Sequence, residues 1–177
     1  MSFFFYRRMS VIRREAKEKL MPALCDQIGL NYNLHPLSSE IIPYRNLSII
    51  PSYDEMTLED QISGKAEEID FNLVEAKLVN VSRDSKGRKS RSTVFQGFLV
   101  EFDFHKNFNG ETIITKDHTA IGNFLTGWAK KGEKVKLEDP EFERKFEVHS
   151  SDQVEARYLL TPLFMERVLK FNRLSSV

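Results

Sequence analysis

The most regular pattern of hydrophobic and polar residues in the chain runs from residue 95 to residue 105. Its alternate positions are apolar on one side and polar on the other: Phe98, Val100, Phe102 and Phe104 against Glu101, Asp103 and His105. Successive side chains of a β-strand point to opposite faces of a sheet, so this period of two is typical of a strand. The pattern predicts an antiparallel strand whose phenylalanine face is buried and whose other face lies in water.

A second strand is predicted just before it, at residues 69–78. Ile69, Phe71 and Leu73 alternate first, and Val74, Ala76 and Leu78 follow in the opposite phase. Such a shift indicates a bulge or a change of face. The polar stretch around Gly87 predicts a hairpin between the two strands, and a turn at 107–110 leads to a short strand at 112–115. Together these segments predict a three-stranded meander.

Helical periodicity marks the N-terminal part of the chain, at residues 10–30. Apolar residues recur there at every fourth position: Ile12, Ala16, Leu20, Leu24 and Ile28. Pro22 is expected to kink or restart this helix, and Gly29 to end it. Residues 31–54 contain three prolines and no periodicity, so they are expected to connect the helix to the sheet with a short helix or turn at most.

The C-terminal part is expected to combine a short strand at 146–148 with a bent helix. Asp139 precedes Pro140 and is expected to cap a short helical turn. Asp152 is followed by Glu155 at the spacing of a capping box. Thr161-Pro162 supplies a second helix start, which predicts helical pieces at 152–160 and 162–172. The glycine-containing segment 118–133 is ambiguous.

These elements predict the α+β class, as one domain over residues 1–177. The sheet is expected to be mainly antiparallel with five or six strands, with the N-terminal helix beside it and the bent C-terminal helix packed on one face. Residues 64–172 would hold this core. Residues 1–9 are expected to be mobile or close to a membrane. The 177 residues, 41% of them hydrophobic, suit one ordinary globular domain.

Charge and cysteine content narrow the function classes. Lys and Arg total 26, as do Asp and Glu, so no overall field steers the chain toward nucleic acid or a membrane, and an electrostatic function would need a local patch. The single cysteine excludes an internal disulfide and a multi-thiolate zinc site, which favours a reducing compartment. The sequence has no run of about 18 apolar residues and no evident signal peptide. We therefore expect a cytoplasmic protein without a spanning segment of its own.

Four blocks of sequence resemble the bacterial family called domain of unknown function 3137. They are Glu59-Asp60 with Ile62 and Gly64-Lys65, VFQGF at 94–98, LEDPEFE at 137–143 with Phe146, and SDQVEARYLLTP at 151–162. The resemblance covers about residues 53–172. It implies no particular reaction or cofactor. It does imply a setting at the cytoplasmic side of the inner membrane, because members often carry membrane segments before this domain.

Two basic stretches are candidate binding sites. The first holds Arg7, Arg8, Arg13 and Arg14 close behind the aromatic residues 3–6, a combination suited to an anionic bilayer surface. The second is the predicted hairpin, with Lys86, Arg88, Lys89 and Arg91. It could hold phosphates or lipid headgroups. The alternative for each is a solvated charged surface, and nucleic acid is not expected as a partner.

The catalytic alternatives rest on histidines. His105, His118 and His149 lack zinc-binding spacing, and no nucleotide-binding or hydrolase motif occurs, so no metal or cofactor is expected. Arg157 is expected to pair with Glu155 or Glu141. The sequence thus favours a non-enzymatic binding or scaffolding module that contacts an anionic membrane or a protein partner. An enzyme with a site near one of these histidines, and a headgroup-binding hairpin, remain alternatives.

Overall fold

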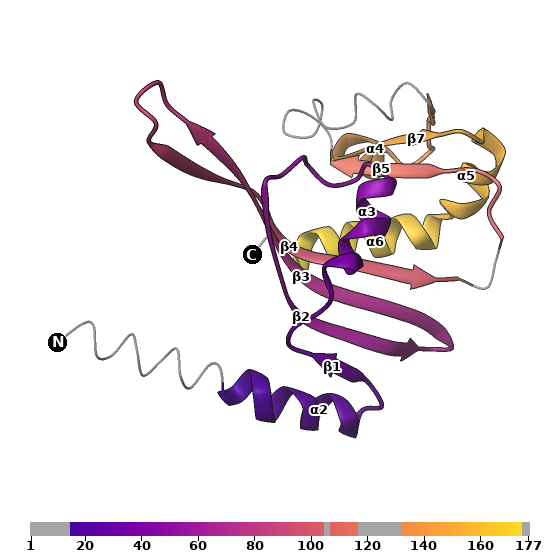
Figure 1. Cartoon of the computed structure of the whole chain (residues 1–177). Coiled ribbons are helices and arrows are strands. Elements are labelled where there is room, and N and C mark those ends of the chain that lie inside the picture. The colour runs from indigo at the N-terminus through magenta and orange to yellow at the C-terminus, as the bar shows by residue number, and fades with distance from the viewer. Residues whose placement is uncertain (1–14, 105–106, 117–131, 175–177) are drawn as a thin grey trace. The chain divides into compact units, whose positions relative to one another are not determined.

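The computed structural model describes residues 15–104, 107–116 and 132–174. The chain divides into two compact units, residues 1–105 and 106–177 (Figure 1). The predicted α+β class is confirmed, and all strand pairs are antiparallel. The strands form two sheets, one of four strands and one of three. That residues 1–177 form one domain stays a prediction.

The sheet of the first unit is a meander in which neighbours in sequence are neighbours in space. Its strands are β1 (Asn31–Asn33), β2 (Glu55–Ala66), β3 (Ile69–Arg83) and β4 (Lys89–Asp103), in that order. Pairing of β2 with β3 ends where Glu55 lies opposite Val79, whereas β3 and β4 stay paired to their tip. The last part of the β3–β4 hairpin is therefore a two-stranded ribbon, which Figure 1 shows projecting from the sheet. We call residues 79–93 the basic arm.

One face of this sheet is covered by a segment that the sequence pattern left as a connection. The 3-10 helix η2 (Ser38–Ile41) and helix α3 (Ile42–Asn46) contribute buried Ile41 and Tyr44. Glu40 accepts a hydrogen bond from Asn72 Nδ2 on β3, at 2.7 Å. The covered face is apolar at its centre, with four buried residues: Val74, Ala76, Leu78 and Leu99.

The predicted burial of the phenylalanine face is wrong, although the strand and its alternation are confirmed. Phe98, Phe102 and Phe104 are 62%, 50% and 48% exposed, whereas Leu99 on the opposite side of β4 is 8% exposed. The physical reason is the cover: Leu99 lies opposite Val74, on the face packed by η2 and α3. The Phe102 ring instead contacts two other phenylalanines, with centroid distances of 6.3 Å to Phe71 and 6.1 Å to Phe104.

The N-terminal helix begins with the π-helical segment η1 (Ala16–Leu20) and continues as α2 (Met21–Gln27). Pro22 lies in the first turn of α2, so the predicted restart is confirmed, and Gly29 follows the helix with a φ of +74°. Cys25 is the buried residue of α2. Leu20, Leu24 and Ile28, part of the predicted apolar stripe, are exposed. Residues 10–14 of the predicted helix lie outside the described residues.

A bulge in β2 fastens this helix to the sheet. The register of β2 against β3 shifts between Glu59 and Ile62, and Asp60 has a φ of +51°. The Lys17 ammonium forms ion pairs with Asp60 and, at 3.0 Å, with Glu59. Tyr32 donates its hydroxyl hydrogen bond to Asp60 as well. These contacts hold the pKa of Asp60 below its usual value despite the opposing effect of burial.

The second unit is built on a three-stranded sheet in the order β5 (Thr112–Lys116), β7 (Phe146–Ser150) and β6 (Glu133–Lys134). The strand predicted at 112–115 is present, but it pairs with β7 and not with β4. The expected meander is therefore wrong in its third member. In the first unit, the third strand of the meander is β2, which pairs with β3.

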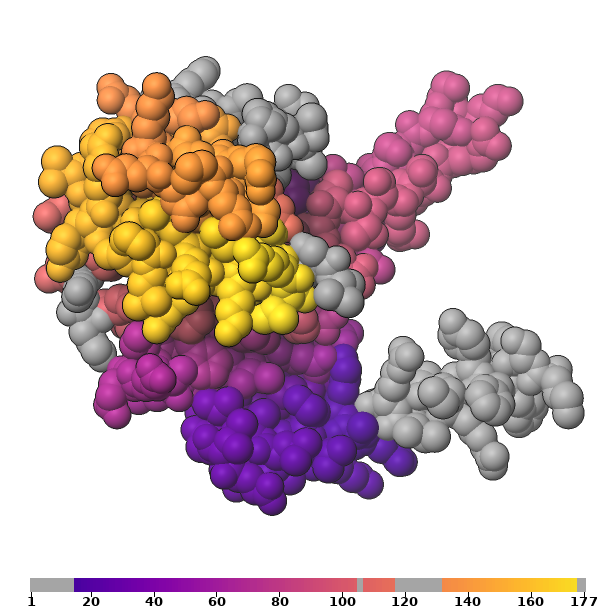
Figure 2. Space-filling view, turned by 180° about the vertical axis from the view of Figure 1, so that it is seen from behind, coloured from indigo at the N-terminus to yellow at the C-terminus, as the bar shows by residue number. Residues whose placement is uncertain are grey.

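The core of the second unit lies between this sheet and three helices. They are α4 (Pro140–Lys145), α5 (Gln153–Leu159) and α6 (Pro162–Leu174). The buried cluster consists of Val135, Phe142, Phe146, Val148, Ala156, Leu160, Met165 and Leu169. The bend between α5 and α6 falls at Leu160 and Thr161, so the predicted two-piece helix and its packing on a sheet are confirmed. Figure 2 shows these helices in orange and yellow as one continuous surface.

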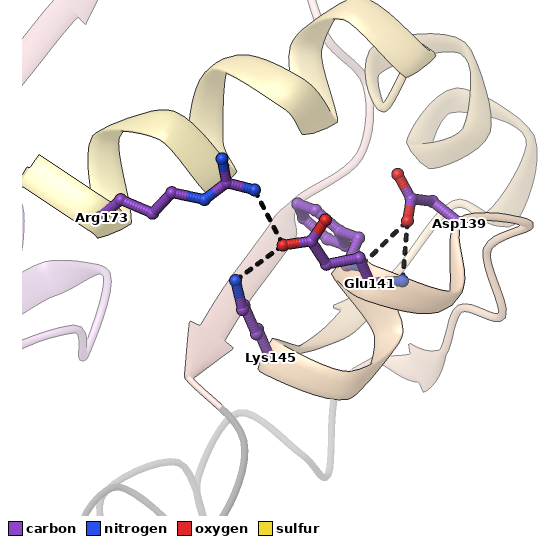
Figure 3. Close-up of polar contacts among 5 residues, drawn as sticks. Asp139, Glu141, Lys145 and Arg173 are labelled. Carbon is purple, nitrogen blue, oxygen red and sulfur yellow. Dashed lines mark hydrogen bonds and ion pairs between the residues drawn. The ribbon is translucent and has the colours of Figure 1, made fainter.

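Helix α4 is capped as predicted and is tied to α6. The Asp139 carboxylate accepts hydrogen bonds from the backbone N–H groups of Glu141 and Phe142, at 2.8 and 3.0 Å. Glu141 in turn accepts from Lys145 Nζ at 2.8 Å and from Arg173 Nη2 at 2.9 Å (Figure 3). The second of these bonds joins α4 to the last turn of α6. It replaces the ion pair predicted for Arg157.

Helix α5 is capped by Asp152, but the predicted capping box is not closed. Asp152 Oδ1 accepts from the backbone N–H of Glu155 at 2.9 Å, as a cap should. The Glu155 carboxylate reaches the loop before β5 instead, where it accepts from Asn109 N at 3.0 Å and Gly110 N at 2.6 Å. Arg157 donates to the carbonyl of Gln153 at 3.3 Å, within its own helix. Glu155 thus anchors a loop.

Candidate functional site

The tip of the basic arm is a turn organised by Asp84. Its Oδ1 accepts hydrogen bonds from the backbone N–H groups of Lys86 and Arg88, both at 2.9 Å, and its Oδ2 accepts from Arg88 Nε at 2.7 Å. Gly87 supplies the left-handed φ of +75° that the turn requires. These contacts hold the pKa of Asp84 below its usual value. They stabilise the conformation of the turn, and they pair the Arg88 guanidinium with a carboxylate of the same turn.

The five basic residues of the arm differ in how far their charges are already paired. Arg88 is paired with Asp84, and Arg91 forms a two-pronged contact with Glu55 at 3.0 and 3.1 Å. Within the described part of the chain, the other three have no ion-pair partner, and all are exposed: Arg83, Lys86 and Lys89. Two of the four hairpin cations singled out from the sequence, Lys86 and Lys89, are therefore available to a ligand.

The register of the arm places the strand cations on one side. Arg83 lies opposite Lys89, and Val81 opposite Arg91, whereas the alternate rungs pair Ser82 with Ser90 and Asn80 with Ser92. Residues directly opposite each other share a face, so Arg83, Lys89 and Arg91 lie together and the other face carries hydroxyl and amide groups. In the sequence, Lys89 and Arg91 are two positions apart, which is the spacing of residues on one face of a strand. That Arg83 lies on the same face follows only from the register.

Such a ribbon can contact an extended anionic surface along one side. Like charges directly opposite each other destabilise a strand pair, so the Arg83–Lys89 rung costs stability in the free protein. An anionic partner would relieve that repulsion. Because the cations lie exposed along a two-stranded ribbon, the arrangement suits a surface better than a small buried ligand.

Of the histidines considered for catalysis, the structure describes His149, and His105 and His118 lie outside the described residues. His149 Nε2 is 3.3 Å from Glu147 Oε1, and Lys134 Nζ is 3.1 Å from the same oxygen. Lys134 is the main cause that lowers the pKa of Glu147. His149 Nδ1 is buried without a hydrogen-bond partner. Within the described ranges, no group of three His, Cys, Asp or Glu residues is placed to hold a metal ion.

The N-terminal basic residues singled out from the sequence, Arg7, Arg8, Arg13 and Arg14, also lie outside the described residues. Their contact with a membrane stays a prediction. None of the helices described here is both long and apolar enough to span a bilayer.

Comparison with known proteins adds one match. Residues 93–176 match the model of a family described as protein of unknown function (DUF3137). The matched range includes three of the four blocks that carry the resemblance and leaves out the block at 59–65. No curated protein and no solved structure matches the chain. The resemblance to the DUF3137 family seen in the sequence is therefore confirmed over residues 93–176.

Proposed function

We propose that this chain is a non-enzymatic binding module that attaches to the anionic cytoplasmic surface of a bacterial membrane through the basic arm. The observation that carries the proposal is the one-sided arrangement of Arg83, Lys89 and Arg91 on a two-stranded ribbon. The exposed turn adds Lys86 at the tip. The groups recognised are the phosphates of lipid headgroups.

The expected binding energy suits reversible attachment. A Lys or Arg close to an anionic leaflet contributes about 1 kcal/mol, and salt screens the attraction within about 8 Å at physiological ionic strength. The three cations without ion-pair partners would together contribute about 3 kcal/mol, which alone gives weak association. A second contact strengthens such binding, and the predicted one is the N-terminal stretch with Arg7, Arg8, Arg13 and Arg14.

Co-sedimentation with vesicles tests the arm. The full chain is mixed with phosphatidylcholine vesicles, with or without phosphatidylglycerol, and the bound fraction is measured. The double variant Arg83→Gln/Lys89→Gln is expected to bind the anionic vesicles about 30-fold more weakly, because two contributions of about 1 kcal/mol are lost. The matched control is Arg167→Gln/Lys170→Gln, which removes the same charge from exposed positions of α6.

Two outcomes would contradict the proposal. One is equal binding of the arm variant and the control variant to anionic vesicles. This result would mean that the net charge of the chain, and not the position of the cations on the arm, determines binding. The other is equal recovery of the wild-type chain with neutral and anionic vesicles. Inorganic phosphate and a short DNA duplex serve as competitors, and release by either at low concentration would favour a free phosphate or nucleic-acid ligand over a lipid surface.

A further inference from the structure

Strand β4 forms one edge of the four-stranded sheet of the first unit. The strand order is β1-β2-β3-β4, so β3 pairs with one side of β4, and among the residues that the structure describes no strand pairs with its other side. The opposite edge is formed by β1, which has three residues, whereas β4 has 15. A free edge presents unpaired backbone N–H and C=O groups, which can pair with a strand of another chain.

The middle of β4 lacks two common means of protecting such an edge. Proteins often place charged residues or proline on a free edge strand, but residues 92–100 (STVFQGFLV) contain neither. Side chains of this stretch are accessible, since Phe98 is 62% exposed and Val100 is 38% exposed. The free edge of β4 is therefore suited to pairing with a further strand.

The charges at the two ends of β4 indicate which strand fits. Lys89 and Arg91 precede the uncharged stretch, and Glu101 and Asp103 follow it. Arg91 and Glu101 are each five positions from Gln96, and Lys89 and Asp103 are each seven. Strand β4 is thus self-complementary in the antiparallel direction, because its basic end then lies beside the acidic end of an identical strand. Parallel pairing would place like charges together, which is unfavourable.

Strand β3 adds to the charge at both ends. Arg83 lies opposite Lys89 at the basic end, and Asp70 lies opposite Asp103 at the acidic end. Each of these like-charge pairs is unfavourable within a single chain. An antiparallel second copy would bring the opposite charge close to both pairs. Association would therefore relieve two repulsions in each copy.

We propose that β4 pairs antiparallel with β4 of a second copy of this chain, about a two-fold axis close to Gln96. The pairing joins the two four-stranded sheets into one and adds the main-chain hydrogen bonds of an antiparallel ladder. A two-fold interface uses the same surface on both copies. Because each copy has one free β4 edge, association stops at a dimer.

A register shift defines how the charges act in this dimer. Leu78 pairs with Phe95 but Val79 pairs with Thr93, so the cations of β4 lie on the other face from its carboxylates. The attraction therefore acts between the ends of the two strands and not within one row of side chains. The two arms point in opposite directions in the dimer, so one arm at a time can lie on a flat membrane.

Sedimentation equilibrium of the full chain, without lipid, tests the proposal. The wild type should form a concentration-dependent dimer whose dissociation constant rises with salt. Asp103→Lys makes both ends of β4 basic, and Lys89→Glu makes both ends less basic or acidic. Each variant alone should dimerise about tenfold more weakly, because attraction becomes repulsion between the strand ends. An equimolar mixture of the two should form a heterodimer with about the wild-type affinity.

Loss of folding would not explain this pattern. Lys89 and Asp103 are both exposed, and each change replaces a like-charge pair within the hairpin by an opposite-charge pair. Gln96→Lys is an independent variant at an exposed position, and it should weaken the dimer because it places two cations together at the axis. The matched control, Asn46→Lys, adds the same charge at an exposed position of α3 and should dimerise as the wild type does.

Three outcomes would overturn the proposal. The first is a chain that stays monomeric up to about 300 µM, in which case the edge would be available to a strand of a different protein. The second is a species larger than a dimer. The third is a mixture of Lys89→Glu and Asp103→Lys that stays monomeric where the wild type dimerises. Lipid is absent from these measurements, so their outcome leaves the vesicle test unaffected.

Discussion

Arg83 and Lys89 face each other across the β3–β4 ladder, and they do so at the opposite end of the ladder from a facing pair of aspartates. Residues 83–91 hold five basic residues and one acidic residue. Residues 65–70 and 101–103 together hold five acidic residues and one basic residue. The chain as a whole has zero net charge, yet this hairpin carries about +4 at one end and about −4 at the other. The two charged ends are roughly 43 Å apart along the strand at 3.3 Å per residue.

The charge separation along this hairpin has a consequence for orientation. An anionic surface attracts the basic arm and repels the acidic end, so the field turns the first unit as well as attracting it. Under the proposed membrane attachment, the acidic end of the hairpin would then face away from the membrane.

The first prediction concerns the cost of the Arg83–Lys89 rung. Lys89→Glu replaces a like-charge pair by an opposite-charge pair, and it should raise the free energy of unfolding by about 0.2–1 kcal/mol. The same change should weaken binding to anionic vesicles. Urea denaturation followed by circular dichroism measures the first effect, and co-sedimentation measures the second. Lower stability in Lys89→Glu would show that the rung carries no repulsion.

The sequence predicted those features of the fold that depend on neighbouring residues in the chain. It did not predict the features that depend on contacts between distant segments. Caps were predicted correctly at Asp139 and Asp152, because an N-cap depends on a few neighbouring residues. Alternation placed the strand containing Phe98, but it left open which face would be covered. The covered face is the one on which η2 and α3 pack, and the sequence of that segment has no periodicity that would predict this.

The candidate sites were predictable only in part for the same reason. The hairpin at 83–91 was evident from its turn residues, yet the pairing of Arg91 with Glu55 needed knowledge that β2 runs beside β3. The cluster of polar and acidic residues at the other end of the hairpin could not be foreseen, because only the register brings residues from Asn31 to Asp103 together. Asn72 has no sequence signal that would distinguish it from any exposed strand asparagine.

The second prediction concerns the turn between β2 and β3. Glu67 and Glu68 both have positive φ values, +49° and +69°, a conformation that costs most side chains about 1–2 kcal/mol. Asn and Gly accept it readily in two-residue hairpin turns. Glu67→Asn/Glu68→Gly should therefore raise the free energy of unfolding by about 1 kcal/mol, net of the greater entropy of glycine in the unfolded chain.

A charge control separates backbone strain from electrostatics at this turn. Glu67→Gln/Glu68→Gln removes the same two charges and keeps side chains that are equally strained. Thermal unfolding should therefore show a larger gain for the Asn-Gly variant than for the Gln-Gln variant. Equal gains would mean that relief of acidic repulsion at this end of the hairpin, and not the turn conformation, dominates.

The third prediction concerns the buried hydroxyl of Ser150, on the central strand β7. It lies 2.9 Å from Thr112 Oγ1, donates toward the Glu111 carbonyl at 3.1 Å, and interacts with the backbone of Asp152 at 2.8 and 3.1 Å. Ser150→Ala leaves these groups without their partner inside the second unit and should lower the free energy of unfolding by about 1–3 kcal/mol. Ser151→Ala, at an exposed neighbour, should cost less in the same urea titration.

The fourth prediction is a pH dependence that originates at Glu141. Hydrogen bonds from Lys145 and Arg173 lower the pKa of Glu141 from 4.5 to about 2. Since the unfolded chain then binds the proton more tightly than the folded chain does, the stabilisation is complete above the unfolded value and is lost as the pH falls from about 4.5 toward 2. Unfolding curves between pH 2 and 7 should be flatter in this interval for Glu141→Gln than for the wild type. Glu138→Gln, on an exposed residue nearby, should keep the wild-type slope, and an unchanged slope in Glu141→Gln would show that the contact of α4 with α6 does not persist in solution.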